Sequence, residues 1–252
     1  DRLMNLLRSV VLALLMLVVT PVFALLGMAS YPLPALTRYR VITRWTDIVM
    51  WGVKWITDIR YEVRGRENMP SEASVILCKH QSAWETMALQ HIFPPVAFVL
   101  KKELLRVPFF GWGLARMPII SIDRNAGIGA LEQVVQQGRA LLAQGFWVVV
   151  FPEGTRVAPG HTKRYKGGGA QLAAKTGAKV VPVAHNAGEF WPRKAFVKRS
   201  GLITLSIGPA IDAHGLNADE INRRTEAWIE AEMRRISPHR YPDAQGIAQS
   251  AA

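Results

Sequence analysis

A histidine and a glutamate lie close together where an apolar run of the chain ends. His80 follows this run in the segment SVILCKHQSAWETMAL, and Glu85 comes shortly after it. If a helix begins near Trp84, the bend from loop to helix can bring the carboxylate back to the imidazole. The carboxylate would then fix the tautomer and stabilise the imidazolium that forms during proton transfer. The spacing predicts a general base that is supported by a carboxylate.

The same segment also fits a purely structural interpretation. Ser82 and Glu85 match the S-x-x-E capping box, in which each side chain accepts a backbone N–H at the start of a helix. The two interpretations are compatible, because a carboxylate that caps a helix can still serve a neighbouring histidine. Ser82 is not expected to act as a nucleophile, since it lacks the flanking glycines of a nucleophile elbow.

A second cluster of reactive side chains is the segment FPEGTR. It places Glu153, Gly154, Thr155 and Arg156 in a predicted tight turn after a buried strand. Glycine permits a close approach of the backbone to a ligand, and a guanidinium group matches two phosphate oxygens. These residues therefore predict a phosphate site. The structural alternative is an ion pair of Glu153 with Arg156 or with Arg124.

Two further cations could complete this anion site. Arg124 follows the apolar run PIISI, which is taken as the strand next to the one that precedes FPEGTR, and Lys166 precedes the glycines of RYKGGGAQ. A glycine-rich helix start offers free backbone N–H groups, which attract anions. The alternative for these glycines is that they only allow close packing.

The predicted elements must hold these segments together. Apolar runs rich in β-branched residues are typical of strands buried on both faces of a sheet, and helical patterns lie between them. Strands are expected at 74–78, 118–122, 146–151, 179–184 and 202–207, with a short edge strand at 61–64. Helices are expected from near Trp84 and at 127–144, 168–176 and 218–236, the last with Asn217 as its cap.

Alternating strands and helices predict an α/β fold, with a mostly parallel or mixed central sheet and helices on both faces. In such sheets, ligands bind beyond the carboxyl ends of the strands. The polar segments KHQSAWE, DRN, PEGTR and HNAGE each follow one of the predicted strands. If these strands are mostly parallel, all four segments meet at one edge of the sheet.

The N-terminal segment is expected to associate with a membrane. Residues 9–37 contain no charged side chain, and about 20 apolar residues suffice to cross a bilayer. Arginines lie on both sides of this stretch, so the charge bias leaves its orientation open. It either spans the bilayer or enters one leaflet, bends near Pro21 and returns. A cleaved signal peptide is disfavoured, because its apolar region is usually about 7–15 residues long.

The segment RWTDIVMWGVKWITDI has an apolar stripe at helical spacing and three tryptophans. Tryptophans beside basic residues suit the headgroup zone of a membrane, and the alternative is a helix packed on the protein body. We therefore expect an N-terminal membrane-associated two-helix segment at 1–59, a catalytic domain at 60–237 and a flexible tail at 238–252.

The composition limits the partners. The formal net charge is +12, which favours phosphorylated molecules or an acidic membrane surface. The basic residues are scattered and match no recognised nucleic-acid fold, so no nucleic-acid partner is expected. A single cysteine, Cys78, excludes an internal disulfide and a cysteine-based zinc site, and its apolar surroundings predict a buried thiol.

Four blocks, HQSAWE, ISIDR, FPEGTR and VVPVA, occur in this order along the chain. Together they resemble the glycerolipid acyltransferase family, over about residues 60–209. The family's usual first block is H-x-x-x-x-D, and Glu85 is one methylene longer than that aspartate. Lys79 stands where an asparagine is common in the family.

The resemblance implies an enzyme that transfers an acyl group from acyl-CoA or acyl carrier protein to the sn-2 hydroxyl of lysophosphatidic acid, giving phosphatidic acid. His80 would be the general base and Glu85 would orient it. The resemblance implies that phosphate is held by Arg124, Glu153, Gly154, Thr155 and Arg156. Pro182 would shape the acyl or acceptor pocket, and Lys79, Ser82, Asp123 and Lys166 are further candidates for supporting the site.

The resemblance further implies that the reaction needs no metal or cofactor. It also implies a location at a membrane, on the cytoplasmic face of the inner or plasma membrane if the protein is bacterial. Three alternatives stay open: another lysophospholipid as acceptor, glycerol 3-phosphate as acceptor, or a non-catalytic module that binds anionic lipid. The acyl donor and the acyl chain length are not determined by the sequence.

Overall fold

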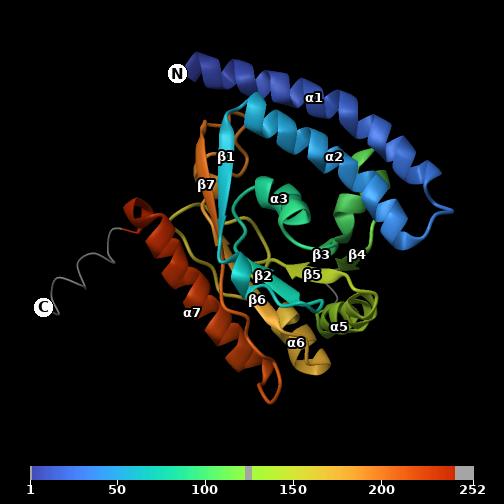
Figure 1. The fold of residues 1–252 in the computed structure, drawn as a ribbon, viewed down its shortest axis with the longest axis vertical. Coiled ribbons are helices and arrows are strands. Elements are labelled where there is room, and N and C mark those ends of the chain that lie inside the picture. The colour runs from blue at the N-terminus through green and yellow to red at the C-terminus, as the bar shows by residue number, and fades with distance from the viewer. Residues whose placement is uncertain (1, 123–126, 242–252) are drawn as a thin grey trace, which may run out of the picture.

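One sheet of seven strands, in the order β1-β7-β6-β2-β5-β3-β4, forms the centre of the protein (Figure 1). The computed structural model describes residues 2–122 and 127–241. The five neighbouring strands from β6 to β4 are parallel, whereas β7 is antiparallel to β6 and parallel to β1. The strands are β1 (Ile59–Arg64), β2 (Val75–Cys78), β3 (Val96–Lys101), β4 (Ile119–Ile122), β5 (Trp147–Val150), β6 (Val180–His185) and β7 (Gly201–Ile207).

Helices cover both faces of the sheet, as the sequence predicts (Figure 1). They are α1 (Arg2–Ala29), α2 (Ala35–Trp55), α3 (Trp84–Ile92), α4 (Phe110–Leu114), α5 (Ile128–Ala143), α6 (Gly168–Thr176) and α7 (Ala218–Ile236). The side chains of β2 alternate between the two faces. Ile76 and Cys78 join the core cluster of α2 and α3, and Val75 and Leu77 join that of α5, α6 and α7. Cys78 is a buried free thiol, as predicted.

Single residues set the end of α6 and the start of α7. Gly177 ends α6 in the left-handed region, with φ of 73°, where glycine meets no steric penalty. At the start of α7, the Asn217 Oδ1 atom accepts a hydrogen bond from the backbone N–H of Glu220 at 2.8 Å. Both helices therefore have the bounds that the sequence predicts.

One strand of the sheet is missing from the sequence prediction. β3 lies between β5 and β4 and pairs in parallel with both. The strand β4 is therefore not a direct neighbour of β5. The predicted cation Arg124, which follows β4, lies outside the described residues.

The two N-terminal helices pack side by side (Figure 1). α1 is long and apolar enough to cross a membrane by its length and composition, and it continues through Pro21. Of the two alternatives left open by the sequence, a chain that reverses near Pro21 is therefore not observed, and the chain reverses between α1 and α2. Gly52 permits this close contact, since a Cβ atom there would lie 2.6 Å from the Leu15 side chain.

α2 packs on the body of the protein with one face only. Val49 and Val53 are buried in the same core as Leu12 of α1, whereas Trp51 and Trp55 are 57 % and 66 % exposed. One face of α2 is thus packed on the protein body, as the alternative interpretation expected. That the exposed tryptophans lie in the headgroup zone of a membrane stays a prediction. The two-helix segment shares its core with the sheet.

The chain is ordered beyond the start of the predicted tail. Residues 238–240 form a short 3-10 helix, and Tyr241 is buried. His239 and Arg240 both contact the Glu189 carboxylate, at 2.6 and 3.4 Å. These contacts hold the first residues after α7 against the body, whereas the sequence predicts a loose chain from residue 238.

Candidate active site

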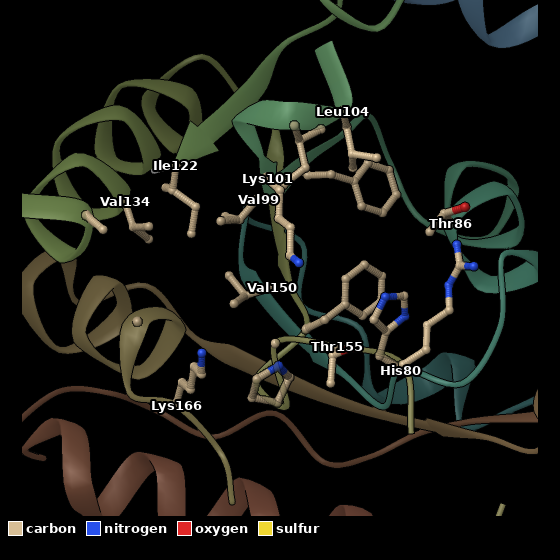
Figure 2. Close-up of a pocket in the computed structure, with 18 of the residues that line it drawn as sticks. His80, Thr86, Val99, Lys101, Leu104, Ile122, Val134, Val150, Thr155 and Lys166 are labelled. Atoms are coloured by element: carbon tan, nitrogen blue, oxygen red, sulfur yellow. The ribbon is translucent and has the colours of Figure 1, made fainter. Parts of the chain in front are cut away.

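His80 lies on the loop between β2 and α3, at the carboxyl edge of the parallel strands, and it lines a large cavity (Figure 2). Its ring stacks on Phe151 with 4.0 Å between ring centroids. The Nδ1 atom is 2.8 Å from the Glu85 Oε1 atom. Because this carboxylate is an acceptor, Nδ1 carries the hydrogen and Nε2 keeps its lone pair. A neutral imidazole in this tautomer can take a proton through Nε2.

Glu85 is fully buried, and its Oε1 atom accepts three hydrogen bonds. Besides His80, the backbone N–H groups of Gln81 and Ser82 donate to it at 2.9 and 2.8 Å. Burial by itself raises the pKa of the Glu85 carboxyl, but its interactions with His185 and His80 and the Ser82 N–H outweigh burial, so the pKa lies below its ordinary value. Glu85 thus supports the histidine and caps α3 at the same time.

His185, at the end of β6, lies behind this pair. Its Nδ1 accepts from the Ala187 N–H at 3.2 Å, so Nε2 carries the hydrogen and donates to the Lys79 carbonyl at 2.8 Å. Burial lowers the pKa of His185 and favours this neutral form. The last residue of β6 is therefore fixed to the residue just before His80.

The FPEGTR segment forms the predicted tight turn after β5. The Gly154 N–H donates to the Phe151 carbonyl at 2.9 Å, and Gly154 has φ of 68°. A Cβ atom at Gly154 would also lie 3.2 Å from the Lys166 side chain. Glycine therefore meets two demands at this position, the left-handed backbone and the space that Lys166 occupies.

The cavity has a volume of about 740 Å³ and two kinds of wall. One part is apolar and comes from β3, α4 and α5, together with Phe151 after β5. The other part carries cations and polar groups around His80. None of the lining residues that the structure describes is acidic; the lysines and arginines among them are Lys101, Arg156, Lys166, Arg193 and Lys194.

Four of the residues predicted for phosphate binding or its support line this cavity with His80. They are Gly154, Thr155, Arg156 and Lys166. Figure 2 shows Thr155 beside His80, with Lys166 across the cavity floor. The structure thus brings His80 and these four predicted residues together in one cavity.

Glu153 has a different position from the one expected. Its side chain is fully buried and does not line the cavity; its Oε1 atom pairs with the Lys79 Nζ at 2.8 Å, and Oε2 accepts from the His80 N–H at 3.1 Å. A carboxylate held in this way cannot face a bound phosphate. The ion pair that the sequence suggested with Arg156 or Arg124 is made with Lys79 instead.

The remaining predicted residues lie elsewhere. The Ser82 Oγ atom accepts from the Trp84 N–H at 3.2 Å and is buried, which is a capping role. Pro182 is buried within β6 and does not line the cavity, so it cannot shape an acyl or acceptor pocket by direct contact. Asp123 and Arg124 lie outside the described residues.

Three cavity cations were not predicted. Lys101 ends β3, the missed strand, and it points into the cavity (Figure 2). Arg193 and Lys194 follow β6, and the Arg193 Nη1 atom donates to the Arg156 carbonyl at 2.6 Å. The signal was present as the pairs KK after an apolar run and RK after FWP. Without the strand order, these pairs cannot be distinguished from ordinary solvated charges on the surface.

The fold and the site define a class of enzyme, an α/β transferase in which a histidine–carboxylate pair adjoins a cationic cavity. A family model described as Acyltransferase matches residues 60–186. A protein of Pseudomonas aeruginosa named 1-acyl-sn-glycerol-3-phosphate acyltransferase is 47 % identical over 210 residues, which is 82 % of each chain. One of Borreliella burgdorferi with the same name is 31 % identical over 66 % of this chain and 67 % of its own.

The fold also matches a solved structure. The PlsC 1-acyl-sn-glycerophosphate acyltransferase of Thermotoga maritima superposes with a TM-score of 0.76 at 19 % identity, over 93 % of this chain and 97 % of that one. The likeness in structure shows a shared fold. The chain belongs to the acyltransferase family and is an acyltransferase, which confirms the resemblance that its four sequence blocks indicate.

Proposed function

We propose that the protein transfers an acyl group from a thioester donor to the sn-2 hydroxyl of 1-acyl-sn-glycerol 3-phosphate, giving phosphatidic acid. The observation that carries the proposal is the cavity in which His80 meets Gly154, Thr155 and Arg156. A lysolipid with its phosphate at the cations can present its glycerol hydroxyl to the imidazole. The names of the related proteins agree with this acceptor.

In the proposed reaction, His80 Nε2 takes the proton of the acceptor hydroxyl. The oxygen attacks the thioester carbonyl, and the carbon–sulfur bond breaks. The imidazolium returns the proton to the leaving thiolate, so the histidine ends as it began. Glu85 holds the Nδ1–H and balances the positive charge of the imidazolium. General bases of this kind contribute about 10²–10⁴ in rate.

The cationic wall is proposed to hold the phosphates of both substrates. Arg156 matches two phosphate oxygens, and Lys166 and Thr155 add further donors. Arg193, Lys194 and Lys101 supply more positive charge than one phosphate monoester needs. Acyl-CoA and acyl carrier protein both carry a phosphate at the end of the pantetheine arm opposite the thioester, and we propose that the surplus cations bind this donor phosphate.

The apolar wall and the N-terminal helices suit lipid substrates. Leu104, Phe110 and Leu114 line the cavity, and Phe110 and Leu114 also border a smaller apolar hollow beside α1 and α2. Acyl chains can therefore lie between the sheet edge and the helices that we propose to rest on the membrane. We propose that the chemistry needs neither a metal nor a cofactor, since the base and the fixed cations supply the required steps.

The test is an assay of the purified protein in mixed micelles, with lysophosphatidic acid and with glycerol 3-phosphate as acceptors and with acyl-CoA and acyl carrier protein as donors. We expect turnover with lysophosphatidic acid, and a loss of about 10³-fold in kcat for His80→Ala with lysolipid binding kept. Exclusive use of glycerol 3-phosphate or of another lysophospholipid would show that the proposed acceptor is wrong. Activity that survives His80→Ala would favour a module that binds lipid without this chemistry.

A further inference from the structure

A buried cluster of charged side chains adjoins His80 without lining the cavity. Lys79 Nζ lies 2.8 Å from Glu153 Oε1 and 2.8 Å from Glu230 Oε1 of α7. The Tyr165 hydroxyl donates to the same Glu230 atom at 2.9 Å. The side chains of Lys79 and Glu153 are fully buried. These four residues are called the Lys79 cluster below.

Stability alone does not explain the Lys79 cluster. Taking ions out of water costs so much that well-packed apolar residues are often equally or more stabilising. Burial lowers the pKa of Lys79, but the two carboxylates more than reverse this, so its pKa is raised and the ammonium is kept. Buried ion pairs of this kind are best explained by the geometry that they specify.

The geometry specified is that of the catalytic loop. Glu153 Oε2 accepts from the His80 N–H at 3.1 Å, so the Lys79 cluster ends directly on the residue that carries the base. The backbone carbonyls of Lys79 and His80 accept further hydrogen bonds. Val157 N donates to the His80 carbonyl at 2.8 Å, and His185 Nε2 donates to the Lys79 carbonyl at 2.8 Å.

We propose that Glu153 and Lys79 are positioning residues for His80. Glu153 fixes the His80 N–H, Lys79 fixes Glu153, and Glu230 ties Lys79 to α7. The inference rests on the proposed role of His80 as general base. It gives Glu153 a part in kcat through the placement of the imidazole, in contrast to the phosphate contact that the sequence suggests.

A glutamine at residue 153 tests this role because it changes one hydrogen bond at nearly constant volume. The carboxylate has two acceptor oxygens, one for Lys79 and one for the His80 N–H. An amide has a single acceptor oxygen, so its NH₂ group must face one of these donors. Glu153→Asp keeps two acceptors on a shorter side chain.

The experiment compares full-length Glu153→Gln, Glu153→Asp and wild type in the lysophosphatidic acid assay, after thermal melting shows that each variant folds. We expect kcat of Glu153→Gln to fall about 100-fold, since a displacement of about 1 Å costs this much, and KM for the lysolipid to stay within about twofold. Glu153→Asp should recover part of kcat. Glu72→Gln is the matched control, because it makes the same change in an exposed ion pair with Lys179.

A raised KM with kcat kept would overturn the proposal and return Glu153 to phosphate binding, and unchanged kinetics would overturn it as well. If Glu153→Gln does not fold, Glu153→Asp decides, with the same split between kcat and KM. A wild-type protein that does not acylate lysophosphatidic acid would reject the proposed function instead, before any variant is compared.

A double-mutant cycle tests the part of Lys79. If Lys79 acts through Glu153, adding Lys79→Met to Glu153→Gln should lower kcat by no more than about threefold further, because coupled residues are not additive. The single variant Lys79→Met should lose activity about as strongly as Glu153→Gln. If this single variant is unfolded, the double variant alone is compared with Glu153→Gln. Losses that multiply would assign Lys79 a role of its own and overturn this step.

Discussion

The two sides of His80 differ in how their polar groups are satisfied. On the protein side, Glu85, Glu153 and His185 are buried and each is held by hydrogen bonds to the loop at residues 79–82. On the cavity side, the five cationic side chains have no carboxylate within ion-pair distance in the described part of the chain; they are Lys101, Arg156, Lys166, Arg193 and Lys194.

This difference assigns different tasks to the two sides. Buried groups with matched donors and acceptors do not need to reorganise during a reaction, so they define geometry and affect the chemical step. Cations without a carboxylate partner leave their charge available to an incoming anion. Salt screens them because Arg156 is half-buried and the other four are exposed. Variants on the buried side should therefore change kcat, and variants on the open side should change KM.

Among the variants that compare the two sides, Glu85→Gln on the buried side is expected to have the largest effect. A glutamine Oε1 can still accept from His80, Gln81 and Ser82, so the loop is kept while the charge beside the imidazolium is lost. We expect kcat to fall about 100-fold, within the usual range for a charged partner of a general base. Initial rates at saturating lysolipid measure this. Near-normal turnover would leave Glu85 with its capping role alone.

The same variant gives a change in pH dependence. The pKa of Glu85 is lowered in the folded protein, so the carboxylate contributes stability above its ordinary pKa and loses it as the pH falls through the lowered value. Glu85→Gln should therefore make the melting temperature less sensitive to acid. Melting curves between neutral and acidic pH show whether the acid-side slope flattens.

A smaller effect is expected on the open side, from Arg156→Ala. A charged hydrogen bond of this kind contributes about 1.5–3 kcal/mol, so we expect the lysolipid KM to rise at least about 10-fold with little change in kcat. The salt dependence of KM should also decrease. Arg139→Ala is the matched control, since Arg139 is exposed and does not line the cavity. A fall in kcat without a change in KM would remove the proposed division between the two sides.

The buried side was only partly predictable from sequence. The pairing of His80 with Glu85 follows from spacing, because both residues lie within one loop-to-helix bend. The partner of Glu153 does not, since Lys79 and Glu230 reach it from distant parts of the chain. A carboxylate within FPEGTR looks like part of the anion site until its burial is known.

Three cations of the open side were missed for a different reason. The strands β2, β5 and β6 were predicted within about one residue, and they place His80 and Arg156 at one sheet edge. Because β3 was not predicted, Lys101 could not be assigned to the sheet edge, and β4 was taken as a neighbour of β5. Strand order is set by pairing between distant segments, and local patterns of apolar residues do not contain this information.

The smallest effect is expected away from both sides, at the start of α7. Asn217→Ala removes the cap that accepts from the Glu220 N–H, and such losses cost about 1 kcal/mol. Chemical unfolding should show this loss, whereas kcat and KM should not change. α7 also carries Glu230 of the Lys79 cluster three turns further on. The variant therefore tests whether the stability of α7 and the position of His80 can be separated within one helix. If loosening the first turn already lowers kcat, the helix as a whole positions His80, and the contrast between stability and geometry within α7 disappears.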